Sequence, residues 1–148
     1  MVNMDNKLKF LDEEHAELMG SLRKLSVSGL STGTAVTDLL TVLEPHFAKE
    51  EKIVMPMLAL AQRLAEGDEV PIESAPQAAQ EIEKEYRTMF REHAEIRVLA
   101  GRAREAALAE KNTDAVETMN WLSHHAEIEE AIVYPLALLA ARLLKCSK

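Results

Sequence analysis

Two short segments of the sequence place a histidine four residues before a glutamate, a spacing that suits metal binding. They read HFAKEEKIVMP, starting at His46, and HAEIEEAIVYP, starting at His125. In a helix, residues i and i+4 lie one turn apart on the same face, so each histidine and its glutamate, Glu50 or Glu129, can hold one ion or two adjacent ions. Imidazole nitrogen and carboxylate oxygen suit iron, manganese or zinc.

The two segments belong to a longer internal repeat. A shift of 79 positions superimposes them, and the match continues beyond Pro56 and Pro135. Upstream, the sequence EHAEL around His15 recurs 78 positions later as EHAEI around His93. The sequence therefore predicts two matching halves, each with two histidines and one glutamate. The six candidate metal ligands are His15, His46, Glu50, His93, His125 and Glu129.

Four long helices are expected to position these side chains. Apolar residues recur at spacings of three and four over residues 4–27, 34–66, 74–110 and 114–146. The segments between them are rich in glycine, serine and other loop-forming residues. The 148 residues are expected to form one domain. Long helices with short connections predict an all-α, antiparallel up-down four-helix bundle with a two-fold internal repeat.

Local signals refine the ends and bends of these helices. Ser74 is predicted to cap the third helix and Asp114 the fourth. Pro56 and Pro135 each lie six residues after the glutamate of their segment. Because proline lacks an N–H and crowds the carbonyl four residues earlier, each helix is expected to bend or restart there.

Glu50 and Glu129 interrupt the apolar faces of the second and fourth helices. An ionised carboxylate in an apolar interior costs several kcal/mol unless it is paired or coordinated. No lysine or arginine lies on these faces to neutralise it, and the predicted inward face of the fourth helix is otherwise Trp121, Leu122, His125, Ile128, Ile132, Val133, Leu136 and Leu139. The pattern favours metal binding over the plain alternative, a metal-free helical interaction domain with ordinary core histidines.

The expected heights of these side chains along the bundle axis indicate a site for two metal ions. His15 and His46 are nearly symmetric about the loop near residue 30, so they are predicted to face each other. His93 and His125 bracket the turn near residue 112 less evenly. Two glutamates shared by two divalent ions leave a net charge of about +2, which should attract an oxo or hydroxo bridge, dioxygen, nitric oxide or peroxide.

Several other polar residues are weighed as additional ligands. Tyr86 lies on the face of the third-helix histidine, where it either reaches the metal or is an ordinary core tyrosine. The repeat assigns the ligand role to the second histidine of the pair and not to His124. Glu51 and Glu130 are expected at the flank of the site, where they orient a histidine. Four further glutamates are assigned to solvated faces: Glu14, Glu17, Glu92 and Glu95.

Composition and charge exclude several classes of function. The chain has 17 basic and 25 acidic residues, a formal net charge of −8 and no basic block, so nucleic acid is not an expected partner. The most apolar stretch, residues 131–144, is short for a membrane span and contains Arg142. The single cysteine, Cys146, agrees with a reducing compartment. We therefore expect a soluble cytoplasmic protein without a membrane partner, and the sequence indicates no particular protein partner.

The repeated histidine and glutamate pattern resembles the hemerythrin-like family, which is described as the HHE cation-binding domain. The resemblance extends from His15 to about Leu143. It implies an up-down four-helix bundle with two iron ions bridged by an oxygen atom and by two carboxylates. By the same resemblance the four histidines of the repeat are terminal ligands, and Glu50 and Glu129 are the bridging carboxylates.

One departure from the family pattern bears on function. Oxygen-carrying hemerythrins have a fifth histidine one turn before the third-helix ligand, and here that position is Met89. Fewer protein ligands leave more open positions, which favours reaction over reversible binding. The resemblance thus implies a protein that binds and reacts with dioxygen, nitric oxide or peroxide in redox or nitrosative stress. A non-catalytic module that binds oxygen, or senses oxygen or iron, is the alternative.

Overall fold

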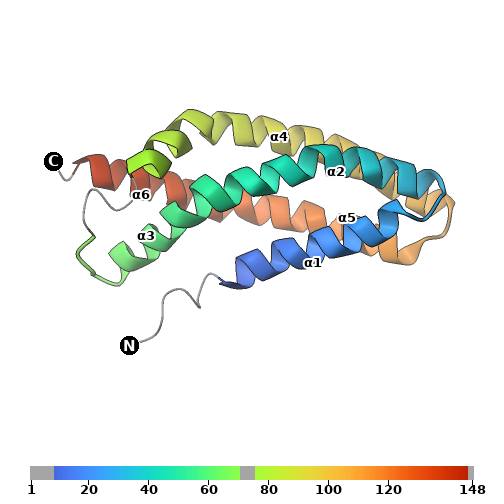
Figure 1. Ribbon diagram of the computed structural model, residues 1–148, viewed down its shortest axis with the longest axis horizontal. Coiled ribbons are helices and arrows are strands. Elements are labelled where there is room, and N and C mark those ends of the chain that lie inside the picture. Colours follow the sequence, from blue (N-terminus) through green and yellow to red (C-terminus); the bar gives the residue numbers. More distant parts are fainter. Residues whose placement is uncertain (1–8, 71–75, 147–148) are drawn as a thin grey trace.

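The computed structural model of the protein describes residues 9–70 and 76–146, which form helices joined by short loops. In chain order the elements are α1 (Lys9–Ser26), α2 (Ser31–Lys49), η2 (Glu50–Val54), α3 (Met55–Ala65), α4 (Pro76–Ala109), α5 (Thr113–Ile128), η4 (Glu129–Val133) and α6 (Tyr134–Cys146). They build four antiparallel rods: α1, α2–η2–α3, α4 and α5–η4–α6 (Figure 1). The predicted all-α four-helix bundle is confirmed. None of the helices in the described ranges has the length and apolar character needed to cross a membrane.

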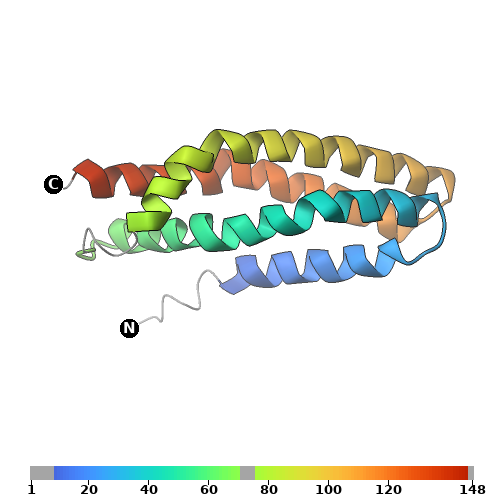
Figure 2. The same cartoon turned by 45° about the horizontal axis from the view of Figure 1, so that its top comes forward.

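The rods are unequal in length, and this divides the bundle into two parts. The α1 helix packs against α2 and α5, whereas α3, α4 and α6 pack together at the opposite end (Figures 1 and 2). Each part has its own apolar core. One core contains Leu18, Leu22, Leu39, Leu43 and Ile96, and the other contains Ile53, Met57, Ile82, Met89 and Val133. Every rod passes from one core to the other at one of the predicted metal ligands.

Two π-helical turns, η2 and η4, begin at Glu50 and Glu129. In each turn the glutamate carbonyl accepts a hydrogen bond from an N–H five residues later, that of Met55 or Tyr134. The next residue in each rod is a proline, which has no N–H and crowds the carbonyl four residues before it. A wider turn accommodates that missing hydrogen bond. The restart predicted from the two prolines is therefore observed.

The η4 turn changes which residues of the last rod face inward. A π-helical turn adds one residue, so the apolar face of α6 is rotated from the direction that an unbroken α-helix would give. Ile132, Leu136 and Leu139, predicted to point inward, are 54, 41 and 53% exposed. The buried residues of this segment are Val133, Tyr134, Ala137, Ala140, Ala141 and Leu144. The prediction was wrong at these three positions because the periodicity was extended through the turn without this extra residue, whereas Leu122, His125 and Val133 are buried as predicted. Ile128 was also predicted to point inward and is 40% exposed; it precedes the turn, so the extra residue does not explain it.

Two hydrogen-bonded caps lie at the α1–α2 end of the bundle, and one of them differs from the prediction. At the start of α2, the backbone N–H and the hydroxyl of Thr32 donate to the carboxylate of Glu110, at 3.1 and 2.9 Å. At the start of α5, Asn112 accepts from the backbone N–H of Ala115 at 3.1 Å, so Asn112 and not Asp114 is the cap. The predicted cap Ser74 lies outside the described residues. Glu110 thus ties the first turn of α2 to the α4–α5 loop.

Replacing Glu110 by alanine is expected to lower the free energy of unfolding by about 1 kcal/mol, the usual loss for a helix cap. The reason is that Thr32 loses the acceptor for its backbone N–H. Urea unfolding of the metal-free protein measures the change. Glu105→Ala, at an exposed position of α4, is the matched control, and equal losses in both variants would contradict the capping role.

Candidate metal centre

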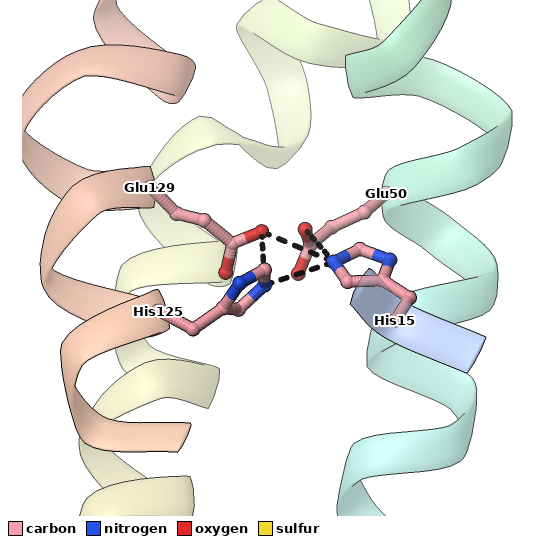
Figure 3. A group of neighbouring side chains, drawn as sticks. All are labelled: His15, Glu50, His125 and Glu129. Atoms are coloured by element: carbon pink, nitrogen blue, oxygen red, sulfur yellow. Dashed lines mark hydrogen bonds and ion pairs between the residues drawn. The ribbon is translucent and has the colours of Figure 1, made fainter. Parts of the chain in front are cut away.

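The six predicted ligands come together at the middle of the bundle, between the two apolar cores. Their exposed fractions lie between 0 and 4%. They form two groups of four residues whose ligand atoms lie within 4.8 Å of one another, and both groups contain Glu50 and Glu129. The first group adds His15 and His125 (Figure 3), and the second adds His46 and His93. Each of the four rods contributes one histidine.

The histidines pair differently from the sequence-based expectation. His15 Nε2 lies 2.9 Å from His125 Nε2, and His46 Nε2 lies 3.0 Å from His93 Nε2. The prediction that His15 faces His46 was wrong. Symmetry about a loop fixes the level of two side chains, but the rotation of each helix decides which neighbour they face. In this closed bundle the α1 histidine turns toward α5, and the α2 histidine turns toward α4.

Each glutamate directs one oxygen toward each histidine pair. Oε2 of Glu129 lies 3.3 Å from His125 Nε2, and Oε1 of the same side chain lies 3.3 Å from His93 Nε2. Glu50 contacts His46 through Oε1, and its Oε2 lies 3.7 Å from His15 Nε2. Metal–nitrogen bonds of about 2.1 Å, as in zinc sites, place adjacent ligand atoms of an octahedral shell about 3.0 Å apart. The spacings of 2.9 to 3.7 Å between these nitrogen and oxygen atoms are compatible with shared ions.

The two carboxylates are electrostatically unlike in the metal-free protein. Burial, followed by the neighbouring carboxylate of Glu129, raises the pKa of Glu50 well above its usual range. Burial also opposes ionisation of Glu129, but contacts with Glu50 and with the site histidines hold its pKa well below its usual range. Both oxygens of Glu50, and Oε2 of Glu129, accept no hydrogen bond from the described residues. Buried acceptors without donors fit a site that takes up a cation.

Three of the four histidines are oriented by a carboxylate at the other ring nitrogen. The Nδ1–Oε1 pairs are His46–Glu92 (3.3 Å), His93–Glu130 (3.1 Å) and His125–Glu14 (3.0 Å). A hydrogen bond from Nδ1 fixes the tautomer in which Nε2 has a free lone pair directed into the site. Lys49 and Arg97 in turn hold Glu92 and Glu130, at 3.0 and 2.7 Å.

These contacts correct part of the sequence analysis. Glu14 and Glu92 were assigned to solvated faces, and that assignment was wrong, because each contacts a site histidine. Glu130 has the orienting contact that was expected of it, whereas Glu51 is exposed. A long side chain can start from a solvent-facing position and still contact a buried ring. Helical periodicity alone therefore does not show whether such a glutamate reaches the site.

The fourth histidine, His15, has a different environment. Its Nδ1 is buried and has no hydrogen-bond partner in the described part of the chain. Its ring stacks on Phe47, with centroids 4.0 Å apart and an interplanar angle of 5°. A surface hollow of about 350 Å³, lined by Met19, Phe47, Glu51 and others, reaches His15. The His15 ring is therefore held by packing, and it lies on the side of the site nearest this hollow.

Of the additional residues considered from sequence, neither Tyr86 nor His124 joins the site, which agrees with the core alternative for Tyr86 and with the choice of His125 over His124. Tyr86 is half-buried and packs on Phe90 with ring centroids 5.1 Å apart, and His124 is exposed. The residue that sequence reasoning missed is Tyr134, whose hydroxyl lies 2.9 Å from His93 Nε2 and 3.2 Å from His46 Nε2. Burial, followed by the charge of Glu50, raises the pKa of this phenol far above its usual value, so the hydroxyl is protonated in the metal-free protein. The helical periodicity gave no signal for Tyr134, because the η4 turn directly before it adds one residue.

Comparison with known families agrees with this site. Residues 6–137 match the family model described as the hemerythrin HHE cation binding domain, and the six predicted ligands all lie inside the match. No curated protein and no solved structure gives a significant match.

Replacing Glu14 by alanine is expected to weaken metal binding by about tenfold to a hundredfold, the usual effect of removing a carboxylate that orients a metal-bound histidine. The ring of His125 would lose the acceptor for its Nδ1–H. Titration of metal-free protein with a divalent ion measures the affinity. Glu17→Ala changes an exposed glutamate on the same helix and should bind as the unmodified chain does; equal affinity in the two variants would contradict the orienting role.

Metal affinity is also expected to depend on pH near neutrality. Burial lowers the pKa of His125, but Glu129 and Glu14 outweigh it and raise the pKa above its ordinary 6.5. A metal binds the deprotonated imidazole, so binding releases this proton, and the affinity should fall as the pH drops through the raised pKa. Zinc titrations at a series of pH values locate the midpoint. Glu14→Ala removes one of the raising contacts and should move the midpoint to lower pH, and an unmoved midpoint would contradict this account.

Proposed function

Since the chain belongs to the hemerythrin HHE cation-binding family, we propose that it is a non-heme di-iron protein of the cytoplasm. In this proposal it binds and reacts with a small ligand, namely dioxygen, nitric oxide or peroxide, during redox or nitrosative stress. The observation that supports the proposal most directly is the sharing of two buried glutamates by two histidine pairs. A single-ion site would need only one of those pairs.

The donor atoms support two ions of the iron type. His15 and His125 would hold one ion and His46 and His93 the other, with Glu50 and Glu129 bridging both. Nitrogen and oxygen donors without a thiolate suit iron, and an oxo or hydroxo group would complete the bridges. Two divalent ions exceed the charge of two carboxylates by about two, which would favour the ionised form of Glu50, whose pKa burial raises in the metal-free protein.

The protein's own contribution is orientation and exclusion of water. The two apolar cores lie on either side of the site, and Met89, fully buried, occupies the position at which oxygen carriers of the family have a further histidine. Two nitrogens and two oxygens per ion leave positions open for an external ligand. Bound iron would supply the electrons that reduction of nitric oxide or peroxide requires.

A sensing module is the second candidate, and the position of the glutamates favours it. Glu50 and Glu129 are the first residues of the two π-helical turns, which lead directly into α3 and α6. A shift of either carboxylate would therefore be passed to the α3–α6 end of the bundle. In this version a change at the iron pair is read by a partner protein, and no turnover occurs.

Protein expressed with iron is expected to contain two irons per chain, one for each group of four ligands, by elemental mass spectrometry. Glu50→Gln and Glu129→Gln should lose most of this metal because a bridging carboxylate is removed. The metal-free form of Glu50→Gln should be at least as stable as the unmodified chain, because burial opposes the charge of Glu50, whereas Glu129→Gln should be less stable, because it loses the histidine contacts that favour its charged form. Glu51→Gln, at the adjacent exposed position, is the matched control and should keep both irons. No iron in the unmodified chain, even after anaerobic reconstitution with ferrous ion, would overturn the proposal.

The same iron-loaded protein separates the two candidates. Consumption of many equivalents of nitric oxide or peroxide in the presence of a reductant supports the enzyme. A stable adduct of fixed stoichiometry, without turnover, supports the binding or sensing module.

A further inference from the structure

Tyr134 is a polar residue of the site to which the family pattern of histidines and glutamates gives no role. It is the first residue of α6, directly after the η4 turn, and its exposed fraction is 0%. Its ring lies between Phe90 and His93, with centroid distances of 5.8 and 5.2 Å. This packing fixes the direction of the phenol, which points at the second histidine pair.

The phenol oxygen occupies the place of a further donor atom. It lies 3.2 Å from His46 Nε2 and 2.9 Å from His93 Nε2, and those two nitrogens lie 3.0 Å apart. The three atoms thus form a nearly equilateral triangle. Adjacent ligand atoms of an octahedral ion with bonds of about 2.1 Å are separated by about 3.0 Å, so the triangle has the dimensions of one face of such a shell.

Metal binding would engage the present partners of this hydroxyl, namely the two histidines and Glu50, because all three would be ligands of the same ion. Nδ1 of His46 and of His93 contacts a carboxylate, which leaves Nε2 of either ring as an acceptor for the single O–H of the phenol. An ion held by the two Nε2 atoms uses their lone pairs. A buried hydroxyl left without a partner is costly. The ion itself then becomes the nearest partner for the phenol oxygen.

The first histidine pair has a different neighbour at the corresponding place. The residue 79 positions before Tyr134 is Met55, a half-buried side chain without a hydroxyl. On that side, Phe47 stacks on His15, and the surface hollow reaches the same histidine. The two ion positions are thus inequivalent although they share both glutamates.

From these contacts we propose that the Tyr134 oxygen is a ligand of the ion held by His46 and His93. The inference rests on the proposed di-iron function. On binding, the phenol O–H bond is replaced by an oxygen–iron bond, and the proton is released to solvent. External ligands consequently bind at the other ion, held by His15 and His125, for which the described residues offer no such phenol and which lies nearest the hollow.

Visible absorption and resonance Raman spectra of the ferric protein test this assignment. A phenolate bound to ferric iron gives a charge-transfer band, and excitation into the band enhances the phenolate ring vibrations. The chain has two tyrosines, so Tyr86→Phe is a matched control. The unmodified chain and Tyr86→Phe should show the band, and Tyr134→Phe should lose it while keeping two irons. Phenylalanine preserves the contact with Phe90, and circular dichroism checks that the variant is folded.

The possible outcomes are distinguishable. Two irons without a phenolate band in the unmodified chain, or a band that persists in Tyr134→Phe, would overturn the tyrosine assignment and leave the di-iron proposal intact. Absence of iron from the unmodified chain would instead overturn the di-iron proposal. If Tyr134→Phe fails to fold, the spectrum of Tyr86→Phe decides the question alone, because Tyr134 is then the one remaining source of a phenolate.

Discussion

The rest of the structure depends on the burial of two carboxylates in the middle of an apolar bundle. Glu50 and Glu129 face each other between two cores, and their orphaned oxygens have no donor among the described residues. In the metal-free protein the two carboxylates can be buried together because their pKa values differ. Burial raises the pKa of Glu50, whereas contacts with its neighbours hold the pKa of Glu129 low. Such a pair favours the binding of a cation, and the surrounding histidines restrict which cations can bind.

Around this pair, the charges are ordered outward in layers. The histidines contact the glutamates through Nε2, and three of them contact outer carboxylates through Nδ1. Lys49 and Arg97, nearer the surface, hold two of those outer carboxylates. Because each layer fixes the orientation of the one inside it, the nitrogen lone pairs are directed at the site before any ion is present, which lowers the ordering cost of binding. His15 is the exception, since packing against Phe47 replaces the outer carboxylate.

The π-helical turn is the local backbone feature that adapts the bundle to this site. Each turn begins at a site glutamate and ends just before the residue that precedes a proline. In the last rod, the extra residue turns Tyr134 toward the histidines and leaves Ile132 at the surface. A residue that an unbroken helix would place elsewhere is thereby brought within hydrogen-bond distance of the site. Localised departures from α-helical geometry at functional sites are a common use of such turns.

The sequence by itself determined the helical architecture and the six candidate ligands, because helical periodicity and the cost of a buried carboxylate are local or nearly local properties. It did not determine which histidines pair, since helix rotation in the closed bundle decides whether His15 meets His46 or His125. Nor did it reveal the contacts of Glu14 and Glu92, or the inward position of Tyr134. Those depend on neighbouring rods and on one extra residue in a helical turn, and only the tertiary structure decides them.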